Sequence, residues 1–176
     1  MTQRTDEKQA RVLLDSAVAT RSIDIERAMG LFAALKDTKF EYQDVAWQQY
    51  AICLHRTGQY KEAETELKRL VKEYGEASIF RAKNLRHLAQ VVAAQGRIGE
   101  IGKWVDEAIR IYEANRDFYN LGRMFQIKAL DEAKTVSIAK ALERLQDGQR
   151  MVEDYTSQTK SETTSRTTQQ PLLAGV

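Results

Sequence analysis

The chain of 176 residues contains one proline, nine glycines and one cysteine. So few turn-forming residues leave little material for the connections that β-sheets require, and we expect no strands. Because Cys53 is the only cysteine, an internal disulfide is excluded. No apolar run approaches the ~18 residues that cross a bilayer, and the first eight residues are polar and charged. These absences predict an all-helical protein in the cytoplasm, without a membrane segment.

The sequence also lacks a constellation of residues that indicates catalysis or metal binding. His55 and His87 are the only histidines, and neither belongs to a His-x3-His, paired-Cys or acid-rich pattern. Gly96, Gly99 and Gly102 are regularly spaced, but no strand precedes them as in a phosphate-binding loop. We therefore predict a protein that is not an enzyme and has no catalytic residues, no cofactor and no metal.

What the sequence does contain is a repeated pattern of large, large, small and large residues. A pattern that recurs within about 20 to 50 residues is typical of stacked repeats, each a small unit that buries its apolar face against its neighbours. The pattern occurs in three windows, Trp47-x2-Tyr50-Ala51-x2-Leu54, Leu85-x2-Leu88-Ala89-x2-Val92 and Phe118-x2-Leu121-Gly122-x2-Phe125. A second pattern follows the first two of these windows at matching distances, as Ala63-x3-Leu67-x2-Leu70 and Ile101-x3-Val105-x2-Ala108.

Local signals predict where several helices begin and end. Gly58 and Gly96 lie between the two patterns, where each can close a helix in the left-handed conformation. Asn115 tolerates the same conformation at the end of a later helix. Asp44 and Asp117 can accept backbone hydrogen bonds in the first turns that they precede or open.

The stretch His55-Arg56-Thr57-Gly58-Gln59-Tyr60-Lys61-Glu62-Ala63 resembles the tetratricopeptide repeat, a unit of about 34 residues with two helices. The resemblance covers roughly residues 8 to 145 and implies an all-α, right-handed α-solenoid of about four antiparallel helix pairs. The usual proline that closes each unit is missing, since the only proline is Pro171. We predict helices at residues 6–20, 23–36, 43–56, 60–74, 78–95, 98–114, 117–129 and 131–154.

This helical domain is predicted to span residues 1–155, followed by a tail at residues 156–176. Nine of the fifteen residues from Thr156 to Gln170 are Ser or Thr and none is apolar, so the tail is expected to be flexible. The apolar tip, residues 171–176, is assigned no function. Gly148 interrupts the last helix, which either continues across it at a cost of about 1 kcal/mol relative to Ala or breaks there.

Charge differs between the two helices of each unit. The first helices of units two to four, at residues 44–56, 81–95 and 117–128, carry six Lys or Arg and two Asp. The second helices, at residues 60–74, 97–113 and 131–147, carry ten basic and twelve acidic residues, as expected of a solvated outer face. The positive excess is therefore a property of one layer, although Arg and Lys can also face water for solubility alone.

In the tetratricopeptide fold the first helices line a concave groove, so the resemblance implies which side chains face it. Arginine suits such a groove because its planar guanidinium holds a carboxylate with two hydrogen bonds. We expect a protein or peptide partner with an acidic segment or a terminal carboxylate. The predicted peptide-binding groove consists of Gln48, Ile52, His55, Arg56, Lys83, Arg86, Gln90, Arg116, Tyr119, Asn120, Arg123 and Gln126.

The predicted function is a non-enzymatic protein–protein interaction module, an adaptor or regulator. The first alternative is a homo-oligomeric scaffold that associates through the open ends of the solenoid. The second is a weakly nucleic-acid-binding repeat, although a net charge of +2 supplies little phosphate affinity. Trp47, Tyr60, Phe118 and Phe125 occupy helix-packing positions and are predicted core residues, whereas Trp104 is expected to be partly exposed.

Overall fold

A computed structural model describes the backbone of residues 2–168 and the side chains of residues 7–157. Over this range the chain forms eight α-helices and one 3-10 turn, η1, with no β-strand. The prediction of an all-α protein is confirmed. The elements are α1 (Thr2–Thr20), α2 (Ile25–Lys36), α3 (Gln43–Arg56), α4 (Tyr60–Glu73), α5 (Ile79–Ala94), η1 (Ile98–Glu100), α6 (Gly102–Ala114), α7 (Phe118–Thr135) and α8 (Ile138–Thr168).

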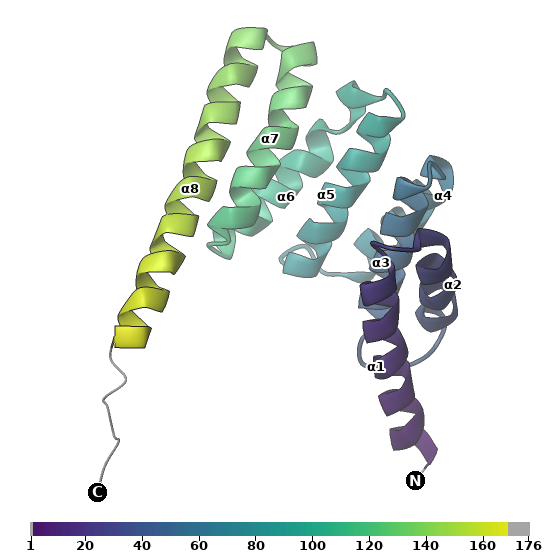
Figure 1. The fold of residues 1–176 in the computed structure, drawn as a ribbon. Helices are drawn as coiled ribbons and strands as arrows, with labels where there is room; N and C mark the ends of the chain where they lie inside the picture. Colours follow the sequence, from purple (N-terminus) through teal and green to yellow (C-terminus); the bar gives the residue numbers. More distant parts are fainter. Residues whose placement is uncertain (1, 169–176) are drawn as a thin grey trace, which may run out of the picture.

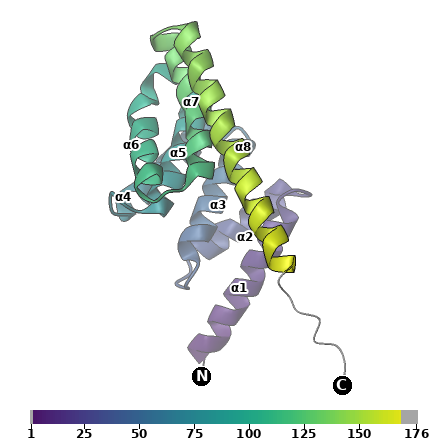
Figure 2. The same ribbon diagram turned by 90° about the vertical axis from the view of Figure 1, so that its left-hand side faces the viewer.

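Consecutive helices pack against one another in antiparallel pairs, from α1–α2 to α7–α8 (Figure 1). Contacts also join α3 to α5 and α5 to α7, so the first helices of units two to four are neighbours. In the second view α4 and α6 lie to one side of α5 (Figure 2). None of the helices that the structure describes is long and apolar enough to cross a membrane.

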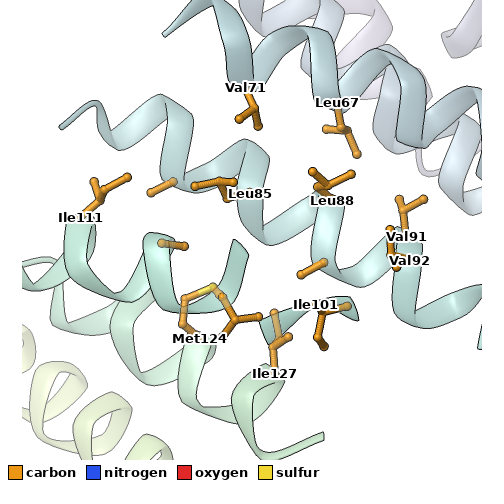
Figure 3. Close-up of a cluster of buried hydrophobic side chains, with 14 of the residues drawn as sticks. Leu67, Val71, Leu85, Leu88, Val91, Val92, Ile101, Ile111, Met124 and Ile127 are labelled. Carbon is orange, nitrogen blue, oxygen red and sulfur yellow. The ribbon is translucent and has the colours of Figure 1, made fainter. Parts of the chain in front are cut away.

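The core consists of the apolar stripes that adjacent helices turn toward one another. The larger of two clusters extends from α3 to α8, and Figure 3 shows side chains of α4 to α7 meeting around Leu85 and Leu88 of α5. A smaller cluster around Phe32 joins α1, α2 and α3. A single short helix is only marginally stable in water, so each helix depends on packing against its neighbours along the stack.

Among the predicted core aromatics, Phe125 is buried but Phe118 is 47% exposed, so the prediction for Phe118 is wrong. Phe118 is the first residue of α7, where the helix end leaves one side of the ring uncovered. Trp47 and Tyr60 are half-buried, and the Trp47 Nε1 donates to Glu66 Oε2 at 2.6 Å. Trp104 is partly exposed, as expected.

The left-handed turns lie close to their predicted positions. Gly58 and Gly96 have φ angles of 80° and 78°, which confirms the assignment of both glycines. At the end of α6 the left-handed residue is Arg116, with φ 54°, and not Asn115. Asn115 instead donates its side-chain amide to the Ile111 carbonyl at 2.8 Å, which satisfies a carbonyl in the last turn of α6.

The two predicted N-caps have different outcomes. The Asp117 carboxylate accepts from the Asn120 backbone N–H at 3.1 Å and caps α7, as predicted. Helix α3 begins at Gln43 as predicted, and Asp44 lies in its first turn, but the cap position is occupied by Tyr42, which makes no side-chain hydrogen bond.

The last helix pair has boundaries that differ from the prediction. Helix α7 continues to Thr135 instead of ending near residue 129, and the chain turns at Val136, which has a non-helical ψ of −77°. Asp131 and Glu132, at the predicted turn, are buried within α7 and paired with Lys128 and Arg144. The helix propensities of single residues do not reveal these ion pairs, so the sequence did not predict that α7 continues past residue 129.

Helix α8 continues without a break through Gly148 and past the predicted domain boundary at residue 155. Of the two possibilities for Gly148, the structure therefore has the continuous helix. The flexibility expected of residues 156–176 stays a prediction, and residues 171–176 lie outside the described part of the chain.

The close contact between Gly122 of α7 and Gly148 of α8 explains why α8 contains a glycine. A Cβ atom on Gly148 would lie 2.6 Å from the Gly122 carbonyl oxygen, and one on Gly122 would lie 2.7 Å from the Gly148 carbonyl oxygen. Helices α7 and α8 thus approach each other backbone to backbone, and a side chain at either glycine would prevent this approach. The close approach offsets the helix-propensity cost of glycine.

Gly148→Ala is expected to lower the free energy of unfolding, because the clash exceeds the about 1 kcal/mol that alanine gains in helix propensity. Gly30→Ala is the matched control, since Gly30 is also helical and a Cβ there meets no atom within 4 Å. This control is expected to stabilise the protein by up to about 1 kcal/mol. Urea denaturation measures both, and stabilisation by Gly148→Ala would contradict the close approach.

Candidate functional site

The residues predicted to line a groove lie on α3, α5 and α7 and in the turn before α7. They differ in exposure, and therefore in how well a ligand can reach them. Those that are exposed are Arg56, Lys83, Arg116, Tyr119 and Gln126; those that are half-buried are Ile52, His55, Arg86, Gln90, Asn120 and Arg123; Gln48 is buried.

Two of these predicted residues are engaged within the protein. Gln48 is only 7% exposed, and its Nε2 donates to Asn84 Oδ1 at 2.8 Å, which links α3 to α5. Asn120 donates its Nδ2 to Asp117 Oδ2 at 2.7 Å and so strengthens the start of α7. Both side chains stabilise the scaffold through these bonds, and we leave them out of the site proposed below.

Arg86 of α5 is the centre of a positively charged cluster. Its Nη2 lies 3.3 Å from His87 Nε2. Burial lowers the pKa of the Arg86 guanidinium, and the positive charge of Arg123 on α7 lowers it further. Because each cation is half-buried and Arg123 lies close enough to act on Arg86, this part of the molecule favours a negative charge.

His87 lies against this cluster as a neutral imidazole. Burial lowers the pKa of His87 to about 3, and the positive charges of Arg86 and Arg123 act in the same direction, while a hydrogen bond with Gln90 opposes them. At neutral pH the charge of the cluster therefore comes from the two arginines.

Two tyrosines pack beside the two arginines. Tyr112 of α6 is fully buried, and burial raises the pKa of its hydroxyl to about 12 even though the nearby Arg86 favours the phenolate. On α7, the Arg123 guanidinium carbon lies 5.8 Å from the centroid of the Tyr119 ring. The Tyr119 ring lies 5.8 Å from the Tyr155 ring, so α8 also reaches this cluster.

Arg86 and Arg123 differ from the other half-buried cations. Over residues 7–157, eight Arg or Lys side chains are half-buried, and six of them have a side-chain oxygen acceptor. Arg86 and Arg123 have no carboxylate within 4.0 Å among the described residues, and the oxygen that lies close to Arg86 is the neutral Tyr112 hydroxyl. The six with an acceptor are Arg21, Lys36, Arg81, Arg97, Lys128 and Arg144.

Sequence reasoning missed the contributions of Tyr112 and Tyr155. Both lie on second helices, α6 and α8, which the repeat pattern assigns to the outer layer. Repeat spacing carries no signal for a side chain that reaches across to the first-helix layer, so only the tertiary structure places these rings beside Arg86 and Tyr119. No group of three His, Cys, Asp or Glu side chains within the described residues could hold a metal ion.

The chain has the fold of tetratricopeptide-like repeat proteins. A crystal structure of nearly identical TPR-like repeats, from a candidate kinesin light chain of Podosopora anserina, superposes with a TM-score of 0.57 at 16% identity. The match covers 88% of this chain and 97% of that chain. A single-residue variant of those repeats gives 0.56 at 15% identity, with 89% and 98% covered. No protein-family model and no curated protein sequence matches the chain.

The lowered pKa of His87 makes stability depend on pH. The unfolded chain binds a proton near the ordinary value of 6.5, whereas the folded chain binds it only near 3, so this contribution is present above pH 6.5 and is lost as pH falls toward 3. Wild type is therefore expected to lose more stability than His87→Gln between pH 7.5 and pH 5, by at most about 1.4 kcal/mol per pH unit. Urea denaturation at both pH values measures the difference, and equal losses would contradict a neutral His87.

Proposed function

We propose that this protein is a non-enzymatic interaction module, an adaptor or regulator, that holds an acidic segment of a partner protein against α3, α5 and α7. The observation that carries the proposal is the pair of half-buried arginines, Arg86 and Arg123, without a carboxylate within 4.0 Å among the described residues. A buried cation without a partner costs folding free energy, so its presence is better explained by an external anion than by stability.

The surrounding side chains suit an extended peptide. His55 and Gln90 supply neutral hydrogen-bonding groups, and Ile52 supplies apolar surface on the same helices. Exposed Lys83 and Arg56 add positive charge that attracts an acidic chain before it docks. Because these side chains stand on packed helices, their positions are set before the partner arrives, which lowers the entropic cost of binding.

The imidazoles do not favour a catalytic role. A general base at neutral pH needs a pKa near the working pH, and that of His87 is about 3. The pKa of His55 is also lowered, by burial. Both rings therefore remain neutral near pH 7, which suits them to hydrogen bonding with a peptide.

Charge reversal of Arg86→Glu together with Arg123→Glu is expected to abolish capture of the partner in a pull-down from the native cell. The physical reason is that carboxylates would then face an acidic ligand across the same surface. Arg110→Glu on α6 is the control for an introduced carboxylate, because Arg110 is exposed on a second helix; it changes the net charge by two units, as each of the two reversals does singly.

Circular dichroism of all three proteins must show the same helicity for this comparison to be valid. Capture that survives the double reversal, or is lost equally in the Arg110→Glu control, would contradict the proposed site. The identity of the captured protein follows from mass spectrometry of the wild-type sample.

A second function, self-association through the ends of the stack, is favoured by exposed apolar side chains on α8. Ile138 is 71% and Leu142 is 55% exposed, and with Leu145 they follow helical spacing on one side of the helix. At the other end, Val12 and Leu13 of α1 are exposed. Apolar side chains grouped in this way indicate a contact with another protein surface.

Under this second function, the mass measured by sedimentation is expected to fall on dilution, and Leu142→Glu is expected to be monomeric at all concentrations. The introduced charge opposes burial of the α8 surface, while its exposed position spares the fold. A wild-type mass that equals one chain at every concentration tested would exclude self-association.

A further inference from the structure

The number of charges and donors around Arg86 indicates which anion the site takes. With His87 neutral, the site carries two positive charges, from Arg86 and Arg123, and no carboxylate of the described residues lies within 4.0 Å of either guanidinium. One carboxylate would leave a net positive charge in a partly buried space. A phosphate monoester carries about −1.5 to −2 charges at pH 7 and neutralises both guanidinium groups.

The Arg86 side chain is held so that one edge of its guanidinium remains available. Its Nε is inaccessible to solvent and, like the buried Tyr112 hydroxyl, has no partner at regular hydrogen-bond geometry among the described residues. The guanidinium and the hydroxyl are nevertheless close, and a hydrogen bond between them favours the charged form of both groups. Nη2 contacts His87, and Nη1 makes no hydrogen bond of regular geometry to a described residue, so it can donate to a ligand.

Arg123 supplies the second guanidinium from the neighbouring helix. Its position over the Tyr119 ring limits the conformations of a long side chain, and the partly exposed Tyr119 hydroxyl is a further donor at the same place. Two guanidinium groups and a phenol offer more donors than the two oxygens of a carboxylate require. They match the three terminal oxygens of a phosphate monoester.

We propose that Arg86 and Arg123 together bind a phosphate monoester, carried by a phosphorylated Ser, Thr or Tyr side chain in the partner segment. This inference rests on the proposed function, since it names the anionic group within the peptide that α3, α5 and α7 hold. It makes binding conditional on phosphorylation of the partner. A kinase acting on the partner would then control assembly.

The test begins with two small probes, inorganic phosphate and acetate, measured by isothermal titration calorimetry at pH 7.5 and constant ionic strength. Wild type is expected to bind phosphate at least about tenfold more tightly than acetate, because charge-assisted hydrogen bonds form to both guanidinium groups. Arg86→Gln and Arg123→Gln are each expected to weaken phosphate binding by about tenfold or more. Arg110→Gln, the matched control, is expected to leave it unchanged.

Folding does not confound this comparison. Arg86→Gln removes a partly buried charge that lacks a counter-ion, so the variant is expected to melt at or above the wild-type Tm. Arg123→Gln provides a second variant on a different helix. Phosphate is expected to raise the Tm of wild type more than acetate does, because a ligand that binds the folded state stabilises it.

The second arm uses the partner segment identified by the pull-down, as synthetic peptides with and without phosphate on each Ser, Thr or Tyr. Tighter binding of one phosphorylated form, lost in Arg86→Gln and Arg123→Gln, supports the inference. Equal binding of all forms overturns it while leaving the proposed function intact. Failure of every peptide to bind overturns the proposed function, while the phosphate titration still decides the anion site. Tighter binding of a twelve-residue oligothymidylate than of any phosphopeptide, dependent on the same arginines, overturns both.

Discussion

Burial of apolar stripes between consecutive helices is the interaction on which this structure depends. Helix α5 shows it most clearly, since Leu85, Leu88, Val91 and Val92 are all buried and meet side chains from both adjacent helices. A helix of this length gains its stability from such packing rather than from propensity. Removing one helix pair would expose the apolar stripe of the next pair. The layer formed by α3, α5 and α7 is therefore held in place by the second helices that cover it.

Polar links add direction to this packing and show how the fold treats its charges. Burial alone would raise the pKa of Glu64, but hydrogen bonds from Lys68, Gln95 and Arg97 more than offset it and lower that pKa to about 2. Arg81 of α5 and Glu107 of α6 are half-buried opposite charges that join two helices. Arg86 and Arg123 have no such counter-ion among the described residues, and the proposed binding of an acidic segment rests on this difference.

The repeat pattern was sufficient to predict the all-α class, the sequential helix pairs and the left-handed glycines at Gly58 and Gly96. It was insufficient at the last pair, because the α7–α8 boundary depends on ion pairs of Asp131 and Glu132 that no propensity encodes. The groove prediction placed Arg86 and Arg123 on neighbouring helices, as the structure has them. Spacing alone could not show that Gln48 is buried by its bond to Asn84.

The sequence by itself determined the periodicity of this protein, because a stripe of apolar residues at helical spacing buries only one face and requires another helix to cover it. It also determined that the first-helix layer carries more positive than negative charge. Only the tertiary structure decided which of those charges are balanced. Arg97 pairs with Glu64 and Arg144 pairs with Glu132, whereas Arg86 contacts the neutral His87 and neither Arg86 nor Arg123 has a carboxylate within 4.0 Å among the described residues. Which side chains come within ion-pair distance depends on how the helix pairs stack, and no local sequence pattern contains that information.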